Sequence, residues 1–231
     1  MKLNEKKELK SYWLQDTRID LEMANQVFEP SLHGLFFAEN IRVGPKEKTI
    51  DIGTGTGLLA ILAAKKGATV CATDISAEAV ELAKKNADRN RVLIDFGVGD
   101  FFANFRQQFD VIMANLPQKI IINPQGSVEG INGGNGGNEI LLKHLAIAQE
   151  FMHKNSRMYI FVYTLTNYLE TLNYILNNYH ANMIAYKTFI EPLVNINTAD
   201  YLKLNENGRV DIFKVNKQWA AIEYFFELSL K

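Results

Sequence analysis

The sequence predicts an α/β fold with a doubly wound, mostly parallel sheet of seven strands, preceded by an N-terminal helical extension. From Lys48 onward, short apolar segments alternate with helical ones, as in a parallel sheet covered on both faces. The glycine-rich sequence GTGTG at residues 53–57 stands where the first strand should turn into a helix. Apolar residues make up 47% of the 231 positions, which is enough for the core of one domain.

The expected elements follow from apolar spacing. Residues 1–45 should form a helical cover, because the apolar side chains around Trp13, Leu21 and Val27 are loosely amphipathic and LHGLFFAENI repeats at helical spacing. Residues 46–231 should form one structural unit. Its expected strands are residues 48–52, 68–74, 91–100, 109–117, 157–165, 181–190 and 219–230, and its expected helices are residues 58–67, 76–90, 138–155 and 168–180. A small extra hairpin is expected between residues 191 and 218.

Composition excludes several classes of protein. A formal net charge of −1 with interspersed signs gives no broad electrostatic footprint for nucleic acid. No run approaches the ~20 apolar residues of a membrane helix, and the N-terminus has no apolar core like that of a signal peptide, so we expect a cytoplasmic location and no membrane partner. The single cysteine, Cys71, lies in an apolar stretch and should be a buried, inert thiol. The four histidines have no metal-ligand spacing, so no metal is expected.

The turn after the first strand is the candidate ligand site. In a doubly wound sheet, ligands bind at the carboxyl ends of the strands, where the strand order reverses. Asp51, Gly53, Gly55 and Gly57 occupy this turn, and glycines let backbone amides approach a ligand closely. The pattern D-x-G-x-G-x-G differs from the G-x-G-x-x-G of dinucleotide sites, and its carboxylate suits a cationic ligand better than a diphosphate. The alternative is a tight turn that packs helix against strand without a ligand.

The motif IDIGTGTG at residues 50–57 resembles the first motif of the class I S-adenosylmethionine-dependent methyltransferases. The resemblance implies a Rossmann-like methyltransferase fold and S-adenosylmethionine as cofactor. It places Asp51 near the methionine portion of the cofactor and packs Gly53, Gly55 and Gly57 against it.

Two further acids extend the resemblance. Asp74 ends the second strand, where the family binds the ribose hydroxyls, and Asp100 follows the third strand, where the family contacts the adenine amine. The alternatives are a helix cap for Asp74 and a turn-stabilising role for Asp100.

The segment FDVIMANLPQK after the fourth strand is similar to the N-P-P-Y signature of amino-methylating members, which include the protein-glutamine methyltransferases that modify release factors. The resemblance assigns catalytic roles to Asn115 and Pro117: the Asn side chain and an adjacent backbone carbonyl accept hydrogen bonds from a planar NH₂. Leu116 and Gln118 depart from the signature, and the missing ring makes a flipped nucleobase a less suitable substrate. The alternative for NLPQ is a strand-ending turn.

Two other segments resemble those of the release-factor and small-domain methyltransferases. In VFEPSLHGLFFAEN, Phe28, Glu29, Pro30 and His33 are expected either to contact ligand or to pack as a helical lid. The glycine-rich residues 126–138 form either a connection or a gate over the substrate. The large N-terminal domain of the glutamine enzymes has no counterpart, which argues against release-factor binding.

The sequence therefore predicts an S-adenosylmethionine-dependent methyltransferase that methylates an amide or amine nitrogen. The acceptor can be a protein, an RNA or a small molecule, and the oligomeric state is not predicted. Two alternatives remain open: a noncatalytic module that binds the cofactor or a partner, and an NAD-dependent oxidoreductase.

Overall fold

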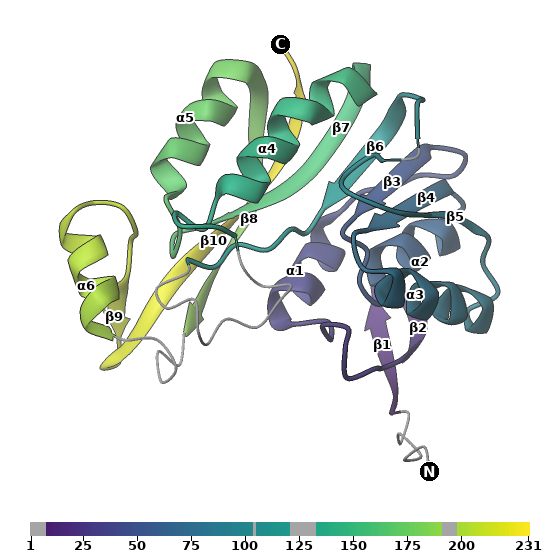
Figure 1. Cartoon of the computed structure of the whole chain (residues 1–231), viewed down its shortest axis with the longest axis horizontal. Helices are drawn as coiled ribbons and strands as arrows, with labels where there is room; N and C mark the ends of the chain where they lie inside the picture. Colours follow the sequence, from purple (N-terminus) through teal and green to yellow (C-terminus); the bar gives the residue numbers. More distant parts are fainter. Residues whose placement is uncertain (1–7, 104, 121–132, 191–197) are drawn as a thin grey trace. The chain divides into compact units, whose positions relative to one another are not determined.

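The computed structural model describes residues 8–103, 105–120, 133–190 and 198–231. The chain forms two compact units, Met1–Asn115 and Leu116–Lys231, and each is described by itself (Figure 1). Within the described ranges, no helix is both long and apolar enough to cross a membrane.

The first unit contains the parallel part of the sheet. Its strands are β3 (Lys48–Ile52), β4 (Thr69–Asp74), β5 (Ile94–Val98) and β6 (Phe109–Ala114), in the order β5-β4-β3-β6. Ile52 pairs with Thr73 of β4 and with Ala114 of β6, so these strands end at one common edge. The order reverses at β3, because β4 and β5 lie on one side of it and β6 on the other. Ligand sites of doubly wound sheets form at such a point.

Two helices pack against these strands. Helix α2 (Leu58–Lys65) is buried from Leu58 to Ala63, which fits its apolar composition, and Gly67 follows it with a φ of 90°. Helix α3 (Ala77–Arg89) is amphipathic and begins at Ser76, whose hydroxyl accepts a hydrogen bond from the Ala79 amide. The predicted cap at Ser76 and the predicted helix end at Gly67 are confirmed.

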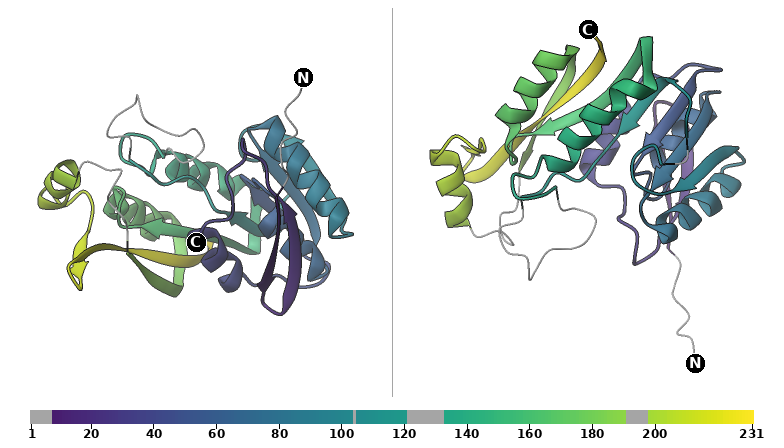
Figure 2. Two further views of the ribbon diagram at one scale, coloured as in Figure 1. Left: turned by 90° about the horizontal axis from the view of Figure 1, so that it is seen from below. Right: turned by 45° about the horizontal axis from the view of Figure 1, so that its top comes forward.

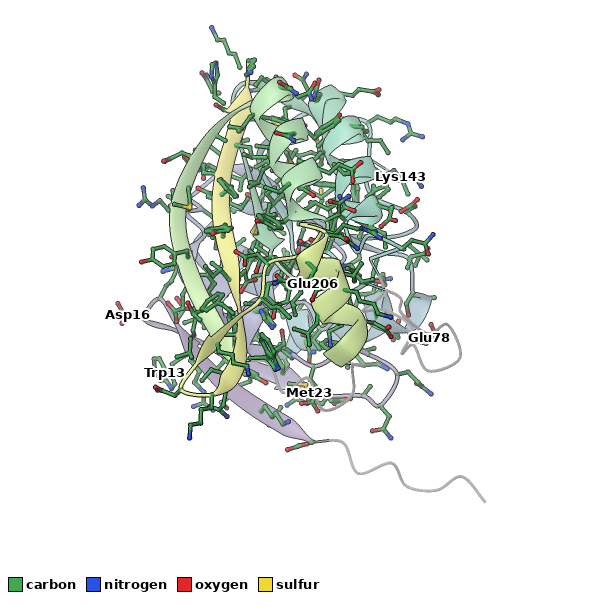
Figure 3. All side chains as sticks on the ribbon, turned by 90° about the vertical axis from the view of Figure 1, so that its left-hand side faces the viewer. Trp13, Asp16, Met23, Glu78, Lys143 and Glu206 are labelled. Carbon is green, nitrogen blue, oxygen red and sulfur yellow. The ribbon has the colours of Figure 1, made fainter. Side chains whose placement is uncertain are left out.

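The N-terminal segment corrects the expected helical cover. Residues Leu9–Leu14 (β1) and Thr17–Glu22 (β2) form an antiparallel hairpin, which packs against α2 and α3 (Figure 2). Along β2, the fully buried Ile19 and Leu21 alternate with less buried neighbours, as in a strand. Trp13 of β1 is labelled in Figure 3 and is 71% exposed. The helical prediction is wrong for this part of residues 1–45. It is confirmed for helix α1 (Leu32–Asn40).

The second unit is mostly antiparallel. Strand β10 (Gln218–Leu230) lies between β7 (Met152–Tyr163) and β8 (Tyr179–Ile190) and is antiparallel to both. Helices α4 (Glu139–Ala148) and α5 (Tyr168–Asn178) pack side by side, and α5 contacts β7 and β8 (Figure 1). The helix expected over residues 138–155 is shorter, because a turn of 3₁₀ helix, η2 (Gln149–Phe151), ends it and β7 begins at Met152.

The region between β8 and β10 contains a short strand, which forms a hairpin with β10 rather than a separate hairpin of its own, and an unpredicted helix. Strand β9 (Phe213–Val215) pairs with the start of β10, and helix α6 (Thr198–Glu206) precedes it. The turn-like sequence NENG at residues 205–208 covers the end of α6 and the turn after it, in which Gly208 has a φ of 67° and its amide donates to the Asn205 carbonyl. The domain boundary expected between residues 45 and 46 stays a prediction.

Candidate cofactor and active site

The glycines of the turn after β3 serve two different purposes. Gly53, Gly55 and Gly57 have φ values of 72°, 53° and 87°, a region that L side chains rarely adopt. A Cβ added to Gly55 would have no atom within 4 Å, so this part of the backbone is open to a ligand. A Cβ added to Gly57 would lie 3.2 Å from the Cβ of Ala83 on α3. Gly57 therefore also permits close packing of the turn against α3.

Strand β4 holds this turn in place. The amides of Gly53 and Thr54 both donate to the carbonyl of Thr73, each at 2.9 Å. The Gly55 amide donates to Asp74 Oδ2 at 2.9 Å, and the Ser76 amide donates to Asp74 Oδ1 at 3.0 Å. Asp74 therefore ties the turn to the start of α3. Each carboxylate oxygen keeps a second lone pair with which it can accept a hydrogen bond from a hydroxyl.

Asp51 is a buried acid beneath the turn. Its Oδ2 accepts hydrogen bonds from the Thr54 hydroxyl at 2.7 Å and from the Ala60 amide of α2 at 3.2 Å. Its Oδ1 is buried and has no hydrogen-bond partner among the described residues. Burial, reinforced by repulsion from Asp74, raises the pKa of Asp51 from 3.8 to about 7. A cationic group near Oδ1 would stabilise the ionised form.

The end of β5 adds a third acid and an apolar surface. Asp100 is exposed at the start of a turn, in which its carbonyl accepts from the Ala103 amide. The Thr73 hydroxyl donates to the carbonyl of Phe101 at 2.6 Å, which brings this turn to the end of β4. Ile75 is 77% exposed directly after Asp74. Ile75 was not predicted as a site residue, although it is an apolar residue directly after a strand-ending acid; its side chain offers surface to a flat, apolar group.

Asn115 follows β6 directly and is half-buried. Ile52 pairs with Ala114. Gly53, the first residue after β3, and Asn115, the first residue after β6, therefore lie side by side. A Cβ added to Gly34 of α1 would lie 3.2 Å from Asn115 Nδ2, so α1 approaches this amide closely. Gly34 could not be recognised from the sequence, because its neighbour Asn115 lies 81 positions away in the chain.

The structure thus gathers most of the predicted site residues at one edge of the first unit. These are Asp51, Gly53, Gly55, Gly57, Asp74, Asp100 and Asn115. Pro117 is half-buried and belongs to the second unit.

Gln118, which stands where the N-P-P-Y signature has its aromatic residue, has a structural role. It is 6% exposed. Its Nε2 donates to the carbonyl of Phe161 at 2.8 Å, and its Oε1 accepts from the amide of Tyr163 at 3.2 Å. The Gln118 amide therefore pairs with the backbone of β7 as a neighbouring strand would.

Part of the glycine-rich segment is also well anchored. The Gly133 amide donates to the carbonyl of Lys119, and the Asn167 amide donates to the carbonyl of Gly136. Asn138 is 1% exposed and donates to the carbonyl of Asn167. Residues 126–132 of the predicted gate lie outside the described residues.

The remaining candidates show ordinary structural contacts. Glu29 forms an ion pair with Lys10 at 2.7 Å, and Phe28 is 57% exposed. The ligand contacts expected of the segment around Pro30 and His33 stay predictions.

Cys71 is buried, as predicted, and burial raises its pKa to about 11. Across the described part of the chain, no cluster of three or more His, Cys, Asp or Glu residues could hold a metal.

A glycine turn after the central strand, with acids at or near the ends of three adjacent strands, is the arrangement in which doubly wound α/β proteins bind nucleotide-containing cofactors. The sequence profile of the ribosomal protein L11 methyltransferase (PrmA) family matches residues 32–133. A Methanocaldococcus jannaschii protein, provisionally named protein N5-glutamine methyltransferase, is 34% identical over 160 residues, covering 67% of this chain and 81% of that protein. A ribosomal protein L11 methyltransferase of Dictyoglomus turgidum is 37% identical over 83 residues, covering 36% of this chain and 28% of that protein.

Solved structures share the fold. The ribosomal protein L11 methylase of Lactobacillus delbrueckii subsp. bulgaricus has a TM-score of 0.52 at 21% identity, covering 86% of this chain and 77% of that one. The 16S rRNA N2 G1207 methyltransferase of T. thermophilus, in complex with AdoMet and guanosine, has a TM-score of 0.58 at 14% identity, covering 94% and 50%. The predicted Rossmann-like methyltransferase fold, with a mostly parallel central sheet, is confirmed.

The chain belongs to the class I S-adenosylmethionine-dependent methyltransferases. S-adenosylmethionine is therefore its cofactor, and the oxidoreductase alternative is set aside. The residues at the carboxyl edge fit this cofactor. Asp51 Oδ1, which has no hydrogen-bond partner among the described residues, suits a ligand with positive charge, and the backbone at Gly55 is open to a ligand.

Proposed function

We propose that the enzyme methylates a nitrogen atom and that its acceptor is the side-chain amide of a glutamine in a protein. The observation that carries this proposal is the position of Asn115. This half-buried residue follows β6 directly and lies beside the cofactor turn, which is the glycine turn at residues 53–57 after β3. An amide oxygen accepts hydrogen bonds from an NH₂ group and so suits a planar amide acceptor. The N5-glutamine name of the M. jannaschii relative points to the same chemistry.

The cofactor residues divide by position along the edge. Asp51, Gly53 and Gly55 would hold the methionine portion, with Gly57 fixing the turn against α3. Asp74 would accept hydrogen bonds from the ribose hydroxyls, and Asp100 would accept one from the adenine amine. Ile75 would provide an apolar surface for the adenine ring.

The reaction would be an in-line transfer, for which the cofactor supplies an electrophilic methyl group. Asn115 Oδ1 would accept a hydrogen bond from the acceptor NH₂ and orient the nitrogen lone pair toward the methyl carbon. Pro117, with its fixed φ, would hold the neighbouring backbone carbonyl as a second acceptor. The new N–C bond forms as the S–C bond breaks, the nitrogen loses one proton to solvent, and S-adenosylhomocysteine leaves. No strong base is required if this proton is lost late.

The role of Gln118 supports an amide acceptor over a nucleobase. Enzymes that act on a flipped base usually stack it between rings. Gln118 stands at the position of that ring in the signature, and both functional groups of its side chain are engaged by β7. A small planar amide needs hydrogen-bond acceptors more than a stacking surface.

The test is transfer of radiolabelled methyl from S-adenosylmethionine into cell extract separated into protein, RNA and metabolites. We expect label in protein, with N5-methylglutamine after complete hydrolysis under conditions that preserve the amide. Asn115→Ala should reduce labelling ~10²-fold or more while cofactor affinity stays within a few-fold. Asn177→Ala is the control, since Asn177 is an exposed residue of α5 and its loss should leave labelling unchanged.

Other outcomes would reject parts of the proposal. Label in RNA or metabolites would reject the protein acceptor. Cofactor binding with no labelling of any fraction would favour the noncatalytic module. Full labelling by Asn115→Ala would remove the role assigned to Asn115. The cytoplasmic location stays a prediction.

A further inference from the structure

Asn86 of α3 and Asn90, the residue that caps the end of α3, take the place of a neighbouring strand for β2. Asn86 Oδ1 accepts from the Glu22 amide at 2.7 Å, and Asn86 Nδ2 donates to the Glu22 carbonyl at 3.1 Å. Asn90 makes the same pair of bonds with Asp20: Asn90 Oδ1 accepts from the Asp20 amide at 3.1 Å, and Asn90 Nδ2 donates to the Asp20 carbonyl at 2.7 Å. The four-residue spacing places both side chains on one face of α3, opposite alternate residues of β2.

The two asparagines differ in their second amide proton. Asn86 Nδ2 also donates to the carbonyl of Thr56, in the middle of the cofactor turn, at 2.9 Å. Asn90 Nδ2 also donates to the carbonyl of Asn86, within α3, at 2.8 Å. Asn86 is fully buried and Thr56 is 4% exposed, so this bond is shielded from water. One side chain therefore joins the hairpin, α3 and the cofactor turn.

The bond from Asn86 fixes the orientation of a peptide plane. The carbonyl of Thr56 and the amide of Gly57 belong to the same planar unit. The Gly57 amide donates to the Thr54 carbonyl at 2.8 Å, so the plane is held at both ends. Of the two residues that flank this plane, Gly57 has a φ of 87° and no Cβ, so the plane would otherwise rotate more easily at that end. Asn86 thus opposes a rotation that Gly57 would permit.

We propose that Asn86 is a positioning residue for cofactor binding, which holds the Thr56–Gly57 peptide in its binding conformation and makes the β1–β2 hairpin part of the cofactor site. The proposal rests on the assignment of the cofactor to this turn. Without the Asn86 amide, the turn would populate other orientations, and the cofactor would bind only to the competent fraction. The hairpin would then affect affinity through one buried side chain.

The experiment compares Asn86→Ala with Asn90→Ala by calorimetric titration of S-adenosylhomocysteine. Both variants lose one amide pair with β2, so they should have similar losses in thermal stability. Asn86→Ala also frees the Thr56 carbonyl, and its Kd should rise roughly tenfold. The Kd of Asn90→Ala should stay within about twofold of wild type, since its amide protons bond to Asp20 and Asn86. Equal Kd values for the two variants, with wild-type binding intact, would overturn the proposal and leave the cofactor assignment standing.

A measurement on the unaltered protein covers the case in which Asn86→Ala does not fold. Amide hydrogen exchange followed by NMR would compare Glu22 and Asp20 with and without S-adenosylhomocysteine. The cofactor should slow exchange at Glu22 several-fold more than at Asp20, because coupling between two sites is reciprocal. Protection of the Gly55 and Gly57 amides with no change at Glu22 would overturn the proposal. Absence of binding by the wild-type protein would instead reject the cofactor assignment itself.

Discussion

Replacing Asp51 with Asn should change how the stability of the cofactor-free protein depends on pH. Burial raises the pKa of Asp51 from 3.8 to about 7. The folded protein therefore binds this proton more tightly than the unfolded chain does. The stabilisation that the folded protein gains from this bound proton is complete below pH ~4 and is lost as pH rises to about 7. In this window Asp51 ionises in the unfolded chain but stays protonated in the folded protein. Each pH unit of the window is worth ~1.4 kcal/mol, so the loss is about 4 kcal/mol.

Asp51→Asn removes this titration and keeps an acceptor for the Thr54 hydroxyl and the Ala60 amide. The assay is urea unfolding of both proteins without cofactor, at steps from pH 4 to pH 8. The free energy of unfolding of wild type, minus that of the variant, should fall by about 4 kcal/mol across this range and then level off. Groups that do not interact with Asp51 titrate equally in both proteins and cancel in the difference. A constant difference from pH 4 to pH 8 would refute the buried, protonated carboxyl inferred from the structure.

Three further variants test other parts of the site. Asp74→Ala should weaken S-adenosylhomocysteine binding by ~1–3 kcal/mol in calorimetry, because it removes the acceptor for the ribose hydroxyls and for the Gly55 amide. Gly34→Ala should slow methyl transfer roughly tenfold by displacing the Asn115 amide, while thermal stability stays equal or rises, since alanine favours a helix by ~0.5–1 kcal/mol over glycine. Gln118→Ala should lower the free energy of unfolding by roughly 3 kcal/mol, measured in urea, because the Phe161 carbonyl and the Tyr163 amide lose their partner.

Each of these expectations has a clear contrary result. If a folded Asp74→Ala variant binds S-adenosylhomocysteine with unchanged affinity, Asp74 serves only to stabilise the N-terminus of α3. Wild-type turnover in Gly34→Ala would show that Asn115 does not depend on its neighbour in α1. For Gln118→Ala, wild-type stability would show that β7 does not need the amide.

The part of the fold that could be predicted is the part in which local pattern and tertiary role agree. β3, α2, β4 and α3 were predicted within a few residues, because buried parallel strands read as apolar runs and α3 carries its own cap at Ser76. The strand-end acids Asp51 and Asp74 were predicted for the same reason: in a parallel sheet, positions directly after successive strands meet at one edge.

The N-terminal hairpin shows what local pattern cannot supply. Its two turn residues, Gln15 and Asp16, have φ values of 48° and 62° without the glycine that usually marks such a turn. The strand pairing of β2 is completed by Asn86 and Asn90, which lie more than 60 positions away. The contact of Gly34 with Asn115 is equally remote in sequence. Such positions become recognisable only once the chain is folded.

The pairing of Gln118 with β7 has a consequence for redesigning this enzyme. A designer who restored the aromatic residue of the signature by Gln118→Tyr would expect to add a stacking surface for larger acceptors. The same substitution would withdraw the amide that bonds to the last residues of β7, and a phenol cannot both donate to Phe161 and accept from Tyr163 in the geometry of an amide. Acceptor range and the hydrogen bonding of the end of β7 are therefore coupled at a single position, and a broadened acceptor range would require a second substitution that satisfies these backbone groups by other means.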